Sequence, residues 1–450
     1  MKAARKEPIH LRRFLRLHPA LSALLLVAVF LSGSACSARK PPEHVPGPSR
    51  FTQALRNQKI LNPSTTMPNG SWLGGDVAAS IPVDDDRRIW LFGDTLVGTF
   101  ATNCPAPLSY CNREMAKGKP SGPVHNSVGV LRGQPGSYSA IERFWGTQDS
   151  GDPTSFFPAG KPDHYLWPLS GVSLEEGLII LANENSNTSG LSPVGAVLIH
   201  IRNPADPPPQ WKMRQKSMPF QASTPKDRRS MNFTSSIVRQ GDFLITIGSR
   251  RNAAGVPESV LARIPLAALE NFDQDWAWEG WMTTSESTSA WTSPLEIDKL
   301  TVLEGLPGAS EATYDQRPDG SWETYQIPVF SFKIHRFAAQ SLEGPWQDKG
   351  AVYEVPVPWN LAPDRDCHRP VLRSARTRKD QTVRRLVAKD PLCSVGHFAA
   401  YAPKSHPGLS PHHGETLTYN VNLFFGNLRA LVRAVEKYPG FYVPRVVTKP

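Results

Sequence analysis

Two aspartates, Asp76 and Asp94, have a spacing that could support acid–base chemistry. The chain around them reads as two short strands, 77–83 and 88–92, joined by a charged turn, with one aspartate opening the first strand and the other closing the second. Each aspartate is nine residues from Asp85. A hairpin centred on Asp85 therefore places them opposite each other, with Cβ atoms about 5 Å apart. Two close carboxyls do not ionise equally easily, so one could act as an acid and the other as a base. The alternative is that each only caps backbone amides at a turn.

Short β-like segments recur along residues 51–450, separated by clusters of Pro, Gly, Asn and Asp. A loose module of polar lead-in, small-residue strand, turn and aromatic-rich strand occurs at 71–95, 231–249 and 309–328. Self-similar hairpins in series predict a β-propeller. We therefore expect a single all-β domain with long loop insertions.

Two segments near the end of the chain complete this picture. Residues 427–437 have apolar positions at helical spacing, which predicts a short C-terminal packing helix. Residues 441–447 read as a closing strand, which in a propeller could complete a blade begun at the N-terminus.

The first 35 residues have the pattern of an export signal. A basic segment precedes the apolar run 21–31 and then small residues. At eleven residues the run is shorter than the ~20 that a spanning helix needs. The small residues end at Cys36, which resembles the lipidated cysteine of bacterial lipoproteins, although Gly33 replaces the usual Leu. The alternative is ordinary cleavage, with Cys36 as a spare thiol. We expect a lipid-anchored extracytoplasmic protein, with 36–50 as a Pro-rich tether.

Four further cysteines remain in the exported part of the chain. Export permits disulfides, and proximity in sequence favours the pairs Cys104–Cys111 and Cys367–Cys393. A zinc site is the weaker alternative because the spacing contains no CxxC.

Composition and missing motifs exclude several functions. The net charge of +10 falls to near +5 without residues 1–35, and there are no basic runs, so we expect no nucleic-acid partner. The sequence has no GxSxG, HExxH, GxxxxGK[ST] or dinucleotide-binding motif. A cluster of His406, His412, His413 and Glu415 matches no standard metal spacing. We expect no metal and no cofactor.

Several motifs together resemble the family catalogued as domain of unknown function 4185. They are WLGGDVAAS and IWLFGDT within 72–95, HNSVGVL at 125–131, SEATYD at 310–315, LEGPW at 342–346, YAPKSHPGLS at 401–410 and LTYNVN at 417–422. Members of that family are five-bladed β-propellers, and some are endo-D-arabinofuranosidases of glycoside hydrolase family 183. The resemblance spans roughly residues 60–445 without matching 364–392, and it maps the acidic pair onto Asp76 and Asp94.

Other residues could complete a sugar-binding site. Glu184 and Glu311 are candidates for a third carboxylate, although each is at least as compatible with a surface turn. Trp72, His125 and Asn126 precede strands in positions like those of the family, and Arg250 follows a strand. The local alternative for His125 is a hydrogen bond within its own loop. Trp90 and Trp167 lie in apolar runs and are expected in the core.

Two functions are compatible with these features. The first is a glycoside hydrolase that cleaves a furanose-rich polysaccharide such as D-arabinan, with two carboxyls that act as acid and as base or nucleophile. The second is a non-catalytic propeller that binds glycan or protein at the cell surface. In both cases we expect a monomer.

Overall fold

The computed structural model describes sixteen stretches of the chain. They are 52–53, 61, 66–67, 70–100, 113–115, 123–135, 137–188, 193–218, 231–252, 256–285, 288–308, 311–328, 332–356, 398–410, 416–423 and 442–448. Residues 49–450 form one compact unit. All five cysteines, the helix expected at 427–437 and the Pro-rich tether lie outside the described residues. No helix within the described stretches is long and apolar enough to cross a membrane.

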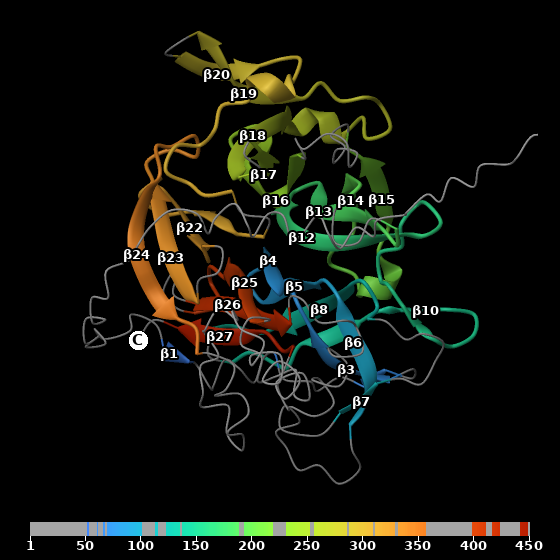
Figure 1. Ribbon diagram of the computed structural model, residues 1–450. Helices are drawn as coiled ribbons and strands as arrows, with labels where there is room; N and C mark the ends of the chain where they lie inside the picture. The colour runs from blue at the N-terminus through green and yellow to red at the C-terminus, as the bar shows by residue number, and fades with distance from the viewer. Residues whose placement is uncertain are drawn as a thin grey trace, which may run out of the picture. The chain divides into compact units, whose positions relative to one another are not determined.

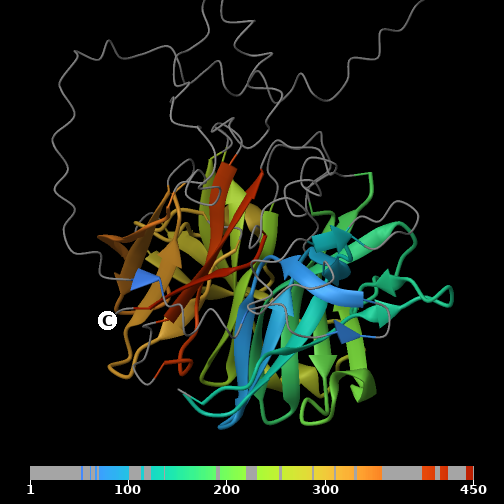
Figure 2. The same cartoon turned by 90° about the horizontal axis from the view of Figure 1, so that it is seen from below.

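The architecture is the expected five-bladed β-propeller (Figures 1 and 2). Each blade is an antiparallel sheet, and in blades 2, 3 and 4 the strands follow one another directly along the chain. Blade 1 contains β4 (Ala79–Asp84), β5 (Arg87–Phe92), β8 (Ser127–Arg132) and β9 (Glu142–Phe144). Blade 2 contains β12 (His164–Leu174), β13 (Gly177–Ser186), β14 (Gly195–Ile201) and β15 (Met213–Ser217). Blade 3 contains β16 (Met231–Gln240), β17 (Phe243–Arg251), β18 (Pro257–Pro265), β19 (Glu279–Ser285) and β20 (Thr288–Thr292).

The remaining two blades close the ring. Blade 4 contains β21 (Tyr314–Gln316), β22 (Trp322–Gln326), β23 (Lys333–Ala339) and β24 (Gln347–Glu354). Blade 5 contains β25 (Phe398–Ser405), β26 (Thr416–Leu423), β27 (Arg445–Thr448) and β1 (Thr52–Gln53). The pairing of β1 with β27 joins the two ends of the domain, which confirms the predicted closing strand.

Smaller elements decorate this ring. The sheet of β2 (Thr66–Met67), β3 (Gly70–Gly75), β6 (Thr95–Phe100) and β7 (Arg113–Met115) extends blade 1. A hairpin of β10 (Gly146–Thr147) and β11 (Pro153–Thr154) follows blade 1. Among the described residues, three short 3-10 helices are present, at Pro208–Gln210, Leu266–Leu269 and Ile297–Lys299.

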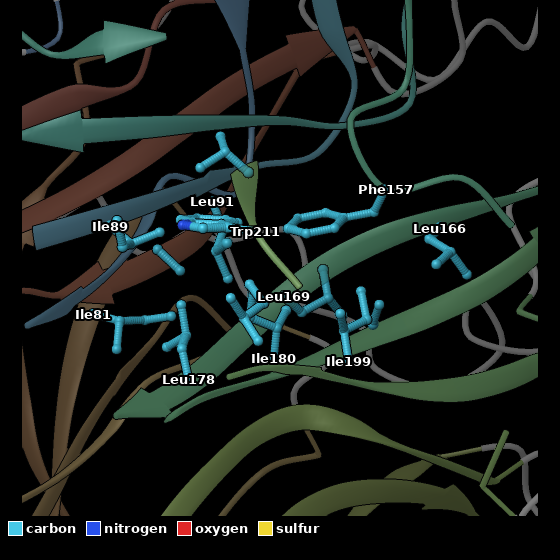
Figure 3. Packing of buried hydrophobic residues seen from close by; sticks show 14 of the residues in the cluster. Ile81, Ile89, Leu91, Phe157, Leu166, Leu169, Leu178, Ile180, Ile199 and Trp211 are labelled. Atoms are coloured by element: carbon cyan, nitrogen blue, oxygen red, sulfur yellow. The ribbon is translucent and has the colours of Figure 1, made fainter. Parts of the chain in front are cut away.

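Apolar side chains between the blades form the core. One cluster joins blade 1, through residues such as Ile89 and Leu91, to blade 2, through residues such as Leu178 and Ile180 (Figure 3). Every residue of β5 and β13 is buried, including the two arginines that begin β5 and the four polar residues that end β13. Burying one such side chain contributes about 1.5–3 kcal/mol. This packing fixes the distance between neighbouring blades and so positions the strand ends at the centre of the ring.

The hairpin of blade 1 is longer than the sequence suggested. The first strand continues from β3 into β4, and the second from β5 into β6, so Asp76 and Asp94 lie at a break in the middle rather than at an open end. Val77 and Ala78 adopt φ of 64° and 48° at this break. Such values are unusual for residues other than glycine, and especially for the β-branched valine. The break turns the hairpin from one sheet to another and leaves both aspartates outside the ladders.

Candidate functional site

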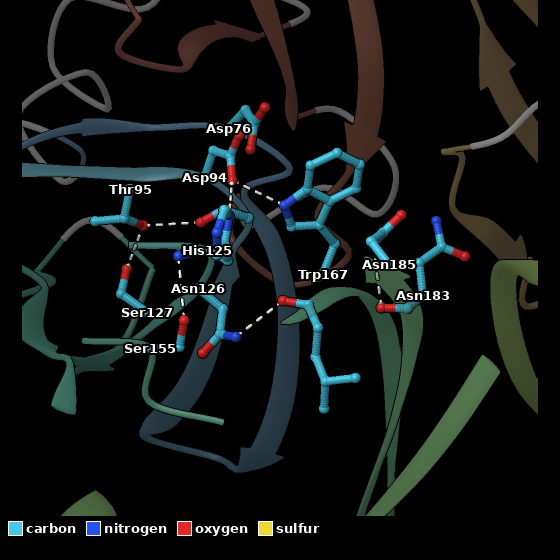
Figure 4. Close-up of polar contacts among 12 residues, drawn as sticks. Asp76, Asp94, Thr95, His125, Asn126, Ser127, Ser155, Trp167, Asn183 and Asn185 are labelled. Atoms are coloured by element: carbon cyan, nitrogen blue, oxygen red, sulfur yellow. Dashed lines mark hydrogen bonds and ion pairs between the residues drawn. The ribbon is translucent and has the colours of Figure 1, made fainter. Parts of the chain in front are cut away.

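Asp76 and Asp94 lie directly opposite each other, as their spacing predicted. The pairs Gly75–Thr95 and Ala79–Leu91 on either side of the break keep the same register. The Asp76 amide donates to the Asp94 carbonyl oxygen at 3.3 Å. Figure 4 shows the two carboxyls side by side.

Two tyrosine hydroxyls from blade 5 hold the Asp76 carboxyl. Tyr401 and Tyr442 donate to Asp76 Oδ2 at 2.9 and 2.8 Å. Burial raises the pKa of Asp76 well above its usual range, and the charges of Asp94 and Glu311 raise it further, while the two tyrosine hydrogen bonds lower it. Asp76 remains partly exposed as a residue. Its surroundings therefore favour the protonated form of the carboxyl.

Two side chains hold the Asp94 carboxyl, one from the loop before β8 and one from β12. His125 Nδ1 lies 3.1 Å from Asp94 Oδ1, and the Trp167 Nε1–H donates to the same oxygen at 2.8 Å (Figure 4). No described residue forms a hydrogen bond with Asp94 Oδ2, and the side chain is 23% exposed. Trp167 was expected in the core. It packs against the core cluster between blades 1 and 2, but it is only partly buried and its indole N–H reaches the site.

A stacked aromatic pair orients His125. The His125 ring lies on Tyr165, with a centroid distance of 3.7 Å and an interplanar angle of 17°. Tyr165 and Trp167 are two residues apart on β12 and so share a face, and their rings meet edge to face at 5.4 Å. Burial and the Asp94 charge raise the pKa of Tyr165 to about 12, so its hydroxyl stays protonated. His125, at 33% side-chain exposure, offers its remaining ring edge to the surface.

Glu311 provides a third carboxyl near the pair. Burial raises the pKa of Glu311; Lys404 opposes this effect and Asp94 strengthens it. Glu311 Oε2 is buried and has no hydrogen-bond partner among the described residues. Lys404 is completely buried on β25. Burial lowers the pKa of Lys404 to about 8, against the opposing charges of Glu311 and Asp76. The site thus contains three carboxyls and one buried ammonium.

Two residues predicted to bind sugar instead stabilise the fold. Trp72 is completely buried, with its ring 5.2 Å from Phe92 and beneath the Arg143 guanidinium, so no sugar can reach it. Asn126 is also completely buried. The Asn126 side-chain amide donates to the carbonyl oxygens of Phe157 and Leu166, and its own oxygen accepts a hydrogen bond from the Phe157 N–H. These hydrogen bonds connect blade 1 to blade 2. Trp72 lies within β3 and Asn126 directly precedes β8, and a side chain at either position can point inward as well as outward. Trp90 is buried as predicted.

Glu184 and Arg250 are occupied by neighbours. The buried Glu184 carboxylate lies 2.9 Å from Lys161 Nζ and 2.7 Å from His164 Nδ1. Arg250 lies 3.4 Å from Glu258 and donates to the Ile297 carbonyl. Neither forms a hydrogen bond or ion pair with Asp76 or Asp94. Their predicted sugar contacts therefore remain predictions. In the structure both side chains form ion pairs with neighbouring residues.

Of the histidine cluster, the described part of the chain contains only His406. His406 is buried, with its ring nitrogens 2.7 Å from Ser80 Oγ and 2.8 Å from Thr418 Oγ1, and it stacks on Trp90 at 4.8 Å. His412, His413 and Glu415 lie outside the described residues. Across the described part of the chain, no group of three His, Cys, Asp or Glu is placed to hold a metal ion.

Sequence reasoning missed four residues of the site. They are Tyr165, Tyr401, Lys404 and Tyr442. Tyr401 and Lys404 lie in the segment YAPKSHPGLS and Tyr442 in the closing segment, but no spacing rule relates them to Asp76, from which the two tyrosines are 325 and 366 residues distant. Only the closure of the ring brings blade 5 to blade 1.

The sequence of this chain matches the model of one protein family. The family model described as "Domain of unknown function (DUF5005)" matches residues 65–368, which is more than half of the chain. The chain belongs to this family. The expectation of domain of unknown function 4185 was therefore wrong. The motifs that suggested it are short, and their Gly and Asp residues suit strand ends and turns in any propeller. No curated protein matches this chain.

Three solved structures align with most of this DUF5005 protein. The structure of a "putative hydrolase" from Bacteroides ovatus aligns over 88% of this chain and 89% of its own, with a TM-score of 0.58 and 14% identity. A thermostable family-43 glycoside hydrolase aligns over 86% and 91%, with a TM-score of 0.35 and 11% identity. An α-L-arabinofuranosidase from Podospora anserina aligns over 86% and 94%, with a TM-score of 0.38 and 9% identity. The first of these establishes a common fold.

Proposed function

We propose that this DUF5005 protein is a glycoside hydrolase whose catalytic residues are Asp76 and Asp94. The observation that carries the proposal is the contrast between two facing carboxyls. The pKa of Asp76 is raised by burial and by its acidic neighbours, while Asp94 is partly exposed and held through one oxygen only. Glycoside hydrolysis requires such a pair, in which one carboxyl donates a proton and the other acts as base or nucleophile.

The proposed reaction gives each acid one role. Asp76 donates its proton to the glycosidic oxygen as the bond from that oxygen to the anomeric carbon breaks. Asp94 either adds to the anomeric carbon or removes a proton from the water that attacks it. Tyr401 and Tyr442 keep the Asp76 carboxyl in place as its charge develops, and His125 and Trp167 do the same for Asp94.

The proposed substrate is a furanose-rich polysaccharide, with D-arabinan as the first candidate. The support is the pair of facing carboxyls, which glycoside hydrolysis requires, together with the aromatic side chains beside Asp94. Tyr165 and Trp167 are half-buried and could stack on a sugar ring. We further propose that the protein acts in the cell envelope, on the outer side of a membrane to which Cys36 anchors it.

The test is hydrolysis of a polysaccharide panel by the mature chain and by two variants. Arabinans and galactans are incubated with the wild type, Asp76→Asn and Asp94→Asn, and new reducing ends are measured. We expect release from one arabinan by the wild type alone. Binding of a polysaccharide without release of reducing ends would favour the non-catalytic alternative. Full activity in either variant would remove that aspartate from the mechanism.

A further inference from the structure

An irregularity in β25 places Tyr401 and Lys404 on the same face of the strand. Tyr401 pairs with Asn420 and Lys404 with Thr418, so three steps along β25 face only two along β26. Ala402 lies within this irregularity and adopts a φ of 49°. Residues three apart normally point to opposite faces of a strand, and one inserted residue reverses that. The bulge therefore turns Lys404 toward the side on which Tyr401 contacts Asp76.

A second irregularity receives the Lys404 ammonium. In β12, Pro168 pairs with Ala182 and Ser170 with Leu181, so Leu169 is the inserted residue and has no partner in β13. Its carbonyl oxygen accepts the hydrogen bond from Lys404 Nζ at 3.3 Å. Lys404 belongs to blade 5 and Leu169 to blade 2, on the two sides of blade 1 (Figure 1). The two bulges together hold one ammonium beneath the acids of blade 1.

The ammonium is placed among charges without being paired to any of them. Among the described residues, no carboxylate lies within 4.0 Å of Lys404 Nζ, and its one hydrogen bond is to a neutral carbonyl. The charged groups that act on it are Glu311 and Asp76, and the Lys404 charge in turn acts on the buried His406. A buried charge without a direct partner is costly. Its retention therefore calls for an explanation.

We propose that Lys404 is a positioning residue of the hydrolase, whose buried positive charge limits how many protons Asp76, Asp94 and Glu311 hold together. This inference rests on the proposed function, since it gives the charge a purpose in acid–base catalysis. Three clustered carboxyls without a cation would bind protons tightly, because each ionised group disfavours ionisation of the next. An ammonium offsets one of these charges, so that one carboxyl ionises more easily while the surroundings of Asp76 favour its protonated form.

The first test compares the pH dependence of kcat/KM for the wild type, Lys404→Met and Lys404→Arg. Loss of the positive charge raises the apparent pKa values of the carboxyl cluster, so the Lys404→Met profile should move to higher pH by about one unit. Lys404→Arg keeps the charge and should restore the wild-type profile even where its rate is lower. A Lys404→Met profile at the wild-type position would overturn the proposal.

The second test needs no substrate. Thermal unfolding is followed between pH 4 and pH 7 for the wild type, Lys404→Met and the surface control Lys299→Met, whose side chain is 58% exposed in a pair with Glu296. Carboxyls that retain protons in the folded chain but lose them on unfolding make stability fall as pH rises. The Tm of Lys404→Met should therefore fall relative to the wild type as pH rises across this range. The difference in Tm between Lys299→Met and the wild type should stay constant. Parallel curves for Lys404→Met would refute the role of Lys404 even if no substrate were found. The expected divergence without any hydrolysis would refute only the proposed function.

Discussion

The Asp76 carboxyl lies against the Cα of Gly93, so closely that a Cβ built there would be 2.5 Å from Asp76 Oδ1 and 2.9 Å from Val77 Cγ2. The Gly93 amide also donates to the Asp76 carbonyl at 3.2 Å. The position of the first acid thus depends on the absence of a side chain opposite it.

Gly93→Ala should displace the Asp76 carboxyl and reduce hydrolysis at least about tenfold, with a loss of about 1–3 kcal/mol in unfolding free energy from overpacking. Gly160→Ala is the matched control, since a Cβ added at Gly160 would meet no atom within 4 Å and the backbone φ there is not positive. Activity assays and urea unfolding of both variants provide the comparison. Equal activities would show that the carboxyl does not need this contact.

Asp76→Asn and Asp94→Asn should each lower kcat by at least about 10²-fold, because an amide can neither donate the proton nor act as base or nucleophile. Their melting temperatures should stay close to that of the wild type, since the amide keeps the size of the carboxyl. Asp86→Asn, at an exposed turn position, is the control. Differential scanning calorimetry separates lost chemistry from lost folding.

Tyr442→Phe removes one of the two hydrogen bonds donated to Asp76 Oδ2. That bond lowers the pKa of Asp76, so its loss should raise the pKa further. Asp76 acts in its protonated form, and activity is lost as pH rises through its pKa. The basic limb of kcat/KM should therefore move to higher pH by about one unit. Tyr138→Phe, whose hydroxyl donates to the Gly408 carbonyl, should leave the limb in place. A shift of the Tyr442→Phe limb to lower pH would contradict the role of Asp76 as the acid.

Asn126→Ala should destabilise the fold by about 2–4 kcal/mol, because three buried hydrogen bonds between blades 1 and 2 lose their partner. Chemical denaturation measures this loss directly. A variant with unchanged stability but weakened polysaccharide binding would instead return Asn126 to the binding residues predicted from the sequence.

Lys404 should also leave a signature in alkaline solution. The pKa of Lys404 is lowered to about 8 in the folded chain by burial, below the ~10.4 of an unfolded lysine. Between these values the unfolded chain binds the extra proton, so stability relative to Lys404→Met should rise with pH from about 8 to about 10, by roughly 3 kcal/mol in total. Below pH 8 the folded chain carries the full free-energy cost of the buried Lys404 ammonium. A stability difference that does not change with pH in this range would show that Lys404 titrates normally.

The sequence alone determined the blade hairpins and their register. In the segments 71–95, 231–249 and 309–328, alternating apolar residues and polar turns define strand pairs locally, because hairpin partners are close in sequence. The facing positions of Asp76 and Asp94 follow from that register. The closing strand was predictable because a propeller must satisfy its last edge.

Tertiary structure decided which side chains surround the two acids. Tyr401, Tyr442 and Lys404 come from blade 5, and Trp167 comes from blade 2, so their positions depend on the order and packing of whole blades. Trp72 and Asn126 show the same dependence in reverse. Trp72 lies within β3 and Asn126 directly precedes β8, yet each faces the core. A local pattern states how strands pair, but only packing between distant segments determines which face becomes buried and which face forms the site.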